Sequence, residues 1–208
     1  MANQRHHRLL TGITAMLTAL SILASGEAAS VPALTPIKAE ATVNYKKLYG
    51  KYLKKHVYTF DDYDVACGSY IYLDNDNIPE LYIEPVSSFT NFLYTIRNGK
   101  VKEIKFGGLG TQIVYYKKKT GKFYVYGKED DATYISRLCR LSNGKVTRYE
   151  EAGWCPFADP GEEASVNGKT VSKKRYNNEK RKISRKTKNW TKIKTKSLKS
   201  LGLLRYMK

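Results

Sequence analysis

Two Asn-Gly pairs constrain the fold more than any other feature, because each lies between runs in which apolar and polar residues alternate. They are Asn98-Gly99 and Asn143-Gly144. A type I′ hairpin turn needs positive φ at both central residues, and Asn-Gly meets this need at little steric cost. The sequence therefore predicts a series of antiparallel hairpins. Weaker versions of the same turn occur at Thr120-Gly121 and Asn167-Gly168.

The alternation of apolar and polar residues predicts eight strands. They are expected at 68–73, 78–84, 91–97, 100–106, 111–118, 122–127, 132–141 and 145–152. Residues 45–56 place Tyr and Leu at helical spacing, which predicts an amphipathic helix, and Ser172 fits the N-cap of a second helix over about 173–183. The predicted fold is α+β: an N-terminal helix, an antiparallel β-meander forming a curved open sheet or a partial barrel, and a short basic helical C-terminal segment.

The N-terminal residues are typical of a secretory signal peptide. A short basic start precedes an apolar stretch over 9–24, and small polar residues follow up to Ser30. This stretch is shorter than the roughly 20 apolar residues that a spanning helix needs. We therefore expect a signal peptide at 1–30 and a secreted, extracellular protein, with attachment to the cell wall as a further expectation. A linker at 31–43, a helix-plus-meander domain at 44–166 and a basic C-terminal segment at 167–208, partly docked on the domain, complete the expected organisation.

Charge is strongly segregated along the 208-residue chain, whose formal net charge is +18. Residues 57–96 carry −7 with no Lys or Arg, whereas residues 165–208 carry +15. Such asymmetry is typical of a segment that meets polyanions, although this segment could also pair with the chain's own acidic part. For an exported protein the expected partners are an anionic cell-wall polymer, lipid head groups or an acidic glycan, and no specific nucleic acid. The candidate contact residues are Lys173, Lys174, Arg175, Lys180, Arg181, Lys182, Arg185 and Lys186.

Acidic residues at alternate positions precede the strand expected at 78–84. The stretch reads Tyr-Leu-Asp-Asn-Asp-Asn-Ile-Pro-Glu-Leu from Tyr72. Calcium binds six to eight oxygens, chiefly from carboxylates and backbone carbonyls, and a tight turn can bring such oxygens together. The stretch is therefore a candidate cation-binding loop.

This stretch resembles the Asp-x-Asp-Gly-Asp-Gly-x-Pro-Glu-Leu loop of many secreted bacterial proteins and is similar to short calcium hairpins of the FG-GAP type. The resemblance assigns the metal ligands to Asp74, Asp76, the Ile78 carbonyl and Glu80, with Ca²⁺ as the ion. Tyr72 stands where the pattern has its first Asp, which implies weak binding. More loosely, most of the mature chain is similar to exported proteins of Gram-positive bacteria without an assigned activity. That resemblance implies export and a β-rich body and nothing catalytic.

Three cysteines would enter an oxidising space if the protein is exported. Spacing does not decide among the pairs 67–139, 67–155 and 139–155 or no bridge at all. We take Cys139–Cys155 as the leading candidate, although the hairpin register sets Cys139 opposite Arg148 and the chain would have to fold back.

No catalytic residues emerge from the sequence. His56 is the only histidine outside the signal peptide, and its position at a helix end suits the helix dipole. We therefore expect a non-enzymatic binding protein. The alternative is a secreted glycan-acting hydrolase or inhibitor that uses an acidic and aromatic sheet face. The aromatic candidates for that face are Tyr70, Tyr72, Tyr124 and Tyr126.

Overall fold

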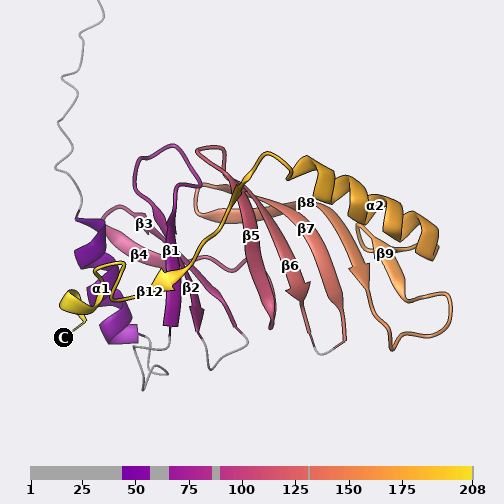
Figure 1. Cartoon of the computed structure of the whole chain (residues 1–208), viewed down its shortest axis with the longest axis horizontal. Helices are drawn as coiled ribbons and strands as arrows, with labels where there is room; N and C mark the ends of the chain where they lie inside the picture. The colour runs from indigo at the N-terminus through magenta and orange to yellow at the C-terminus, as the bar shows by residue number, and fades with distance from the viewer. Residues whose placement is uncertain (1–43, 57–65, 86–89, 131, 208) are drawn as a thin grey trace, which may run out of the picture. The chain divides into compact units, whose positions relative to one another are not determined.

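Antiparallel strands in two open sheets dominate the computed structural model, with one helix near the N-terminus and one near the C-terminus (Figure 1). The structure describes residues 44–56, 66–85, 90–130 and 132–207, so the predicted signal peptide and linker lie outside the described residues. The elements are α1 (Tyr45–His56), β1 (Ala66–Ile71), β2 (Glu80–Pro85), β3 (Phe92–Arg97), β4 (Lys100–Glu103), β5 (Thr111–Lys117), β6 (Lys122–Lys128), β7 (Tyr134–Ser142), β8 (Lys145–Trp154), β9 (Ala164–Val166), β10 (Lys169–Thr170), α2 (Lys173–Lys186), β11 (Thr191–Lys192), β12 (Lys196–Ser197) and a 3-10 turn, η2 (Leu204–Tyr206).

In each sheet the strands β1 to β4 and β5 to β10 lie in chain order, as a meander requires, and the short strands β12 and β11 are each added at one edge. The orders are β12-β1-β2-β3-β4 and β10-β9-β8-β7-β6-β5-β11. The Asn-Gly turns have the expected geometry, with φ of 52° at both Asn98 and Asn143 and φ of 70° and 72° at the glycines that follow. The predicted α+β fold with an open antiparallel meander is confirmed.

The meander divides into two sheets between β4 and β5. The strand predicted over 100–106 ends at Glu103, although the burial pattern continues beyond it, with Ile104 and Phe106 in the core and Lys105 exposed between them. The chain then passes the backbone of Glu129 so closely that a Cβ at Gly108 would collide with the Glu129 carbonyl oxygen. The glycine therefore allows a close approach at which pairing with the first sheet stops and the second sheet begins.

Three apolar clusters give the layer order α1, five-stranded sheet, seven-stranded sheet, α2. Tyr49 and Leu53 of α1 pack on one face of the first sheet. The opposite face, with Tyr82, packs against Phe123 and other residues of the second sheet. Tyr176 and Ile183 of α2 cover the far face of that second sheet. Each sheet therefore has a helix on its outer face and a shared core on its inner face.

The C-terminal residues return from the second sheet to the first. After α2, β11 pairs with β5 and β12 pairs with β1. Leu198 and Leu203 are then buried in the cluster around α1. In the part of the chain that the structure describes, no helix combines the length and apolar character needed to cross a membrane.

Candidate functional site

The acidic loop between β1 and β2 is folded by its own carboxylates. The Asp76 backbone N–H donates to Asp74 Oδ1 at 3.2 Å, and the Ile78 N–H donates to Asp76 Oδ1 at 2.9 Å. Asn77, which replaces the usual Gly, has φ of 62°, and Asn tolerates this left-handed conformation better than most residues do. The loop therefore has a defined turn that brings its two aspartates to the same side.

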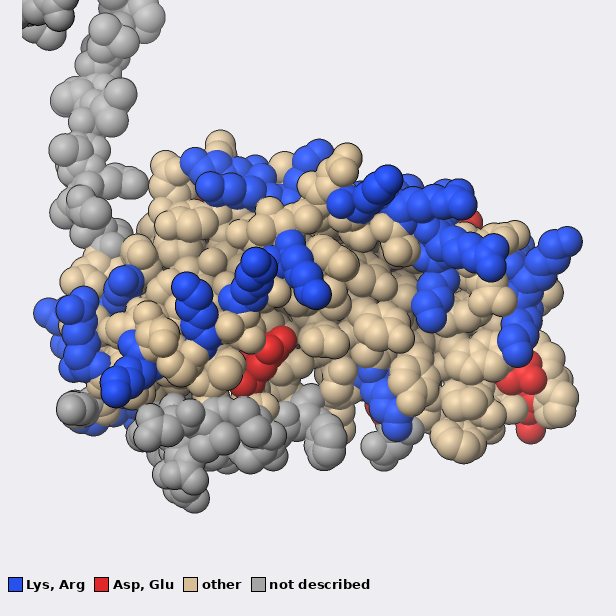
Figure 2. Space-filling view, in the orientation of Figure 1, with Lys and Arg blue, Asp and Glu red and all other residues tan. Residues whose placement is uncertain are grey.

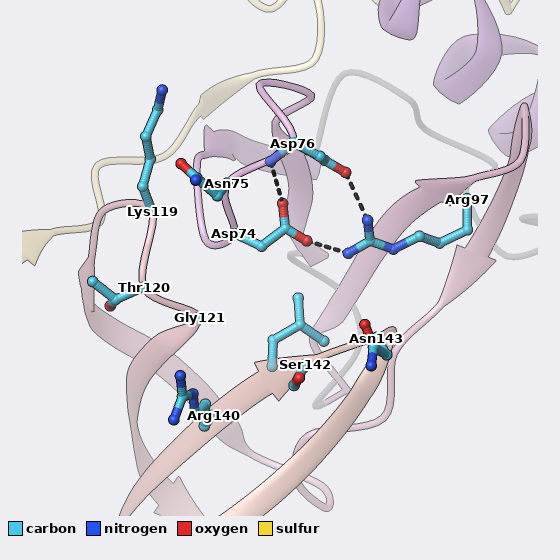
Figure 3. Close-up of a pocket in the computed structure, with 11 residues that line it drawn as sticks. Asp74, Asn75, Asp76, Arg97, Lys119, Thr120, Gly121, Arg140, Ser142 and Asn143 are labelled. Carbon is cyan, nitrogen blue, oxygen red and sulfur yellow. Dashed lines mark hydrogen bonds and ion pairs between the residues drawn. The ribbon is translucent and has the colours of Figure 1, made fainter. Parts of the chain in front are cut away.

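Arg97 of β3 binds both aspartates (Figure 3). Its Nη1 donates to Asp76 Oδ2 at 2.7 Å, and its Nη2 donates to Asp74 Oδ2. The three side chains are each between 18% and 28% exposed, so water screens the pairing only in part. A guanidinium therefore lies between the two carboxylates to which the sequence assigned a calcium ion.

Glu80 takes part in a different set of interactions. Its side chain is fully buried at the start of β2 and accepts hydrogen bonds from the Leu73 N–H at 2.9 Å and from Thr95 Oγ1 at 3.2 Å. Burial, and after it the nearby charge of Asp74, raises the pKa of Glu80 to about 8. Across the described residues no three acidic, His or Cys side chains converge on one point. The structure brings Asp74 and Asp76 together with Arg97, while Glu80 faces the interior.

Calcium has to compete with Arg97 for this loop, and that competition can be measured by thermal unfolding. In chelator, we expect Arg97→Gln to lower the melting temperature because it leaves two neighbouring carboxylates without a cation. Millimolar calcium should raise the melting temperature of Arg97→Gln more than that of the wild type, since a ligand of the folded state stabilises it by mass action. Adding Asp74→Asn to Arg97→Gln should abolish the calcium effect. An equal calcium shift in wild type and Arg97→Gln would show that calcium binds without displacing the guanidinium.

The loop borders an open hollow of about 460 Å³ (Figure 3). The turn between β5 and β6 and the hairpin between β7 and β8 supply the rest of its lining, including Lys119 and Arg140. The Lys119 ammonium donates to Asn77 Oδ1 at 2.7 Å and so ties the β5–β6 turn to the acidic loop. The lining contains no histidine or cysteine, and both of its carboxylates are paired with Arg97. Nothing in this hollow forms a nucleophile and base pair.

The basic C-terminal helix lies on the outer face of the seven-stranded sheet, against β7, β8 and β9. It begins as predicted, with the Ser172 hydroxyl accepting from the Arg175 N–H, and it extends three residues further than expected. Lys173 lies over the Trp154 ring at 5.1 Å, and Lys180 lies over the Tyr126 ring at 5.7 Å. In both lysines the ammonium group itself lies over the face of an aromatic ring, which is a cation–π arrangement.

The other basic residues of α2 project outward. Lys182 pairs with Glu179 at 3.2 Å and Lys186 pairs with Glu150, and these are the ion pairs of α2 within the described ranges. Besides Lys173 and Lys180, which lie over aromatic rings, four residues of the candidate set are exposed and have no carboxylate partner in that same part of the chain, namely Lys174, Arg175, Arg181 and Arg185. Figure 2 shows the resulting concentration of blue side chains over α2 and over the connection that follows it.

The described part of the acidic segment does not neutralise this helix. Asp74 and Asp76 bind Arg97, Glu80 is buried, and Glu84 accepts from the Tyr82 hydroxyl at 2.9 Å. The remaining acidic residues of the segment, at 61, 62 and 64, lie outside the described residues. Among the described residues no ion pair joins this segment to the basic tail, although the tail does dock on the segment through β12, which pairs with β1.

The possible Cys139–Cys155 disulfide is absent from the structure, in which all three cysteines are free thiols. Cys139 lies opposite Arg148 as the register predicted, whereas Cys155 follows Trp154, which pairs with Tyr134. About six residues of extended strand therefore separate the two, or roughly 20 Å at about 3.3 Å per residue, far beyond the Cα separation that a disulfide allows. Burial raises the pKa of the Cys139 thiol to about 12, which disfavours the reactive thiolate.

The aromatic residues of the alternative function are largely covered. Tyr45 of α1 meets Tyr70 edge to face at 5.1 Å between ring centroids. Tyr124 is buried in the cluster beneath α2, and Tyr126 lies under Lys180. Tyr72 is partly exposed, with Lys118 over its ring at 5.4 Å. These rings therefore do not form an open stacking platform for a glycan.

A buried ionic cluster was not foreseen from the sequence. Arg137 of β7 is fully buried and donates to both carboxylate oxygens of Glu129, at 2.7 and 2.6 Å, and to Glu151. Arg148 also reaches Glu129 at 3.3 Å. The signal available in the sequence was the position of Arg137 among alternating inward residues of β7, where an apolar side chain is expected.

Comparison of the chain with known protein families, with curated proteins and with solved structures finds no match.

Proposed function

We propose that this protein is an exported, non-enzymatic binding protein that holds an anionic polymer against the outer face of α2. The observation that carries the proposal is a row of cations on a helix whose opposite face is fixed to a sheet. Lys174, Arg181 and Arg185 are exposed and spaced seven and four residues apart, which places them along one side of the helix. The helix therefore holds these charges in a fixed arrangement, so the ligand does not have to order a flexible tail.

The acidic loop supports a structural role within this proposal. Arg97 supplies the positive charge between Asp74 and Asp76, and the Lys119–Asn77 hydrogen bond joins the loop to the β5–β6 turn. A weakly bound calcium ion in place of the Arg97 guanidinium would likewise strengthen the attachment of the loop to the domain. The loop then stabilises the domain that carries α2 and does not itself contact the polymer.

Charge removal on α2 tests the proposal. The purified protein should bind immobilised dextran sulfate with an affinity that falls as salt rises, because binding releases counterions from the polymer. The variant Lys174→Gln/Arg181→Gln/Arg185→Gln should lower the steepness of the log K against log salt plot by about 2, from three lost contacts at about 0.7 each.

The matched control removes three exposed lysines from α1, as Lys47→Gln/Lys51→Gln/Lys55→Gln. It changes the net charge by the same amount on a different helix and should leave the salt dependence close to that of the wild type. If the α2 and α1 triple variants lowered the salt slope equally, net charge alone would drive binding, and the proposal would fail.

A further inference from the structure

The segment that joins the two sheets, residues 191–197, is held in an extended conformation, and we call it the strap. At one end β11 pairs with β5, and the Ile193 N–H continues the contact by donating to the Val114 carbonyl at 3.0 Å. At the other end β12 pairs with β1. In Figure 1 the strap is the yellow connection that runs from α2 past β5 to β12. Backbone hydrogen bonds at both ends therefore fix its direction.

Side chains along the strap alternate between the protein and solvent. Ile193 packs against the core between the sheets, and Thr195 and Ser197 are half-buried. The intervening residues are Lys192, Lys194 and Lys196, all exposed. Within the described residues none of these three lysines forms an ion pair. An extended backbone advances about 6.6 Å for every two residues, so the three lysines leave the exposed side of the strap at about that spacing.

We propose that this row binds a linear phosphodiester polymer, one phosphate to each lysine, and the inference rests on the proposed polyanion-binding function. Two residues of peptide backbone and one three-carbon phosphodiester repeat contain the same number of main-chain bonds. Their extended lengths are therefore nearly equal, and successive phosphates can meet successive lysines without a change of register. Lysine suits this contact, because its ammonium is a compact charge whose three N–H groups can donate to phosphate oxygens in many orientations.

The spacing also separates this partner from other polyanions. In acidic glycans whose charged and neutral rings alternate, the charge repeat is a disaccharide and is longer than the lysine repeat. A row of lysines contacts phosphates and not bases, so it carries no sequence preference.

The strap begins five residues after α2 ends, and Lys188 lies exposed between them, so one polymer can follow the helix and then the strap.

Binding of two phosphodiester polymers with matched numbers of phosphates tests the inference. The probes are a glycerol-phosphate polymer and single-stranded oligothymidylate, with hyaluronate, which carries one carboxylate per disaccharide, for comparison. The variant Lys192→Gln/Lys194→Gln/Lys196→Gln should reduce the salt slope for both phosphodiester probes by about 2, and Lys194→Gln alone by less than 1. The α1 triple variant serves again as the control of equal charge.

Each result has a defined meaning. The inference is supported if the strap variant has a lower salt slope than the α1 control with both phosphodiester probes. A lower slope with only one of the probes also supports it and identifies the source of the phosphodiester. An equal dependence of hyaluronate binding on the strap overturns the choice of phosphodiester. If the α2 variant loses affinity and the strap variant does not, the inference fails while the proposed function stands. If neither variant differs from the α1 control, both fail.

Discussion

Replacing Glu129 with Gln should destabilise the protein by about 3 kcal/mol, because the buried Arg137 guanidinium loses one of its two carboxylate partners and keeps only Glu151. Arg137 is 0% exposed and depends on Glu129 for two of its hydrogen bonds. For a domain of 150–250 residues, such a loss lowers the melting temperature by about 10 °C. Thermal and urea unfolding of the wild type and of Glu129→Gln would measure it.

The exposed pair Glu179–Lys182 supplies the control. These side chains are 29% and 59% exposed, so Glu179→Gln should change stability by less than about 0.5 kcal/mol. The double variant Glu129→Gln/Glu151→Gln should be less stable than Arg137→Met, because the double variant leaves the buried guanidinium with no carboxylate, whereas Arg137→Met removes the guanidinium. If Glu129→Gln were no more costly than Glu179→Gln, the cluster would not stabilise the fold.

Local sequence rules predicted the elements whose geometry depends on neighbouring residues. The Asn-Gly turns, the Ser172 cap and the helix over 45–56 each follow from a few adjacent side chains, and the structure contains all three. The boundaries that moved, such as the end of β4, depend on packing against a distant segment. Local periodicity carries no information about that packing.

In the candidate site, too, contacts between nearby residues were predictable from the sequence and contacts between distant residues were not. The turn of the acidic loop was predictable, because its hydrogen bonds join residues two positions apart. Arg97 is 21 and 23 residues from the aspartates that it binds, and nothing in the local motif indicates it. Likewise, β11 and β12 are two-residue strands whose partners are remote in sequence, so their alternation was too short to be recognised.

Glu80 should make the protein less stable as the pH rises from about 5 to 8. Its pKa is raised to about 8 in the folded state, against an ordinary value of 4.5, first by burial and then by the charge of Asp74. Between these two values the folded state binds a proton that the unfolded state has lost. The free energy of unfolding therefore falls with rising pH by about 1.4 kcal/mol per unit from this group. The stabilising contribution is complete below the unfolded pKa and is lost as the pH passes the folded pKa.

Glu80→Gln should remove this dependence without disturbing the contacts. The Gln carbonyl can accept from the Leu73 N–H, and its amide can donate to Thr95 Oγ1, so both present hydrogen bonds have a counterpart. Unfolding measured in chelator at pH 5, 6, 7 and 8 should give similar stabilities for wild type and variant at pH 5 and a more stable variant at pH 8. The exposed substitution Glu179→Gln should follow the wild-type curve throughout. Because other groups titrate equally in both proteins, the difference between the two curves isolates Glu80, and parallel curves would mean that Glu80 is already ionised at pH 5 in the folded state.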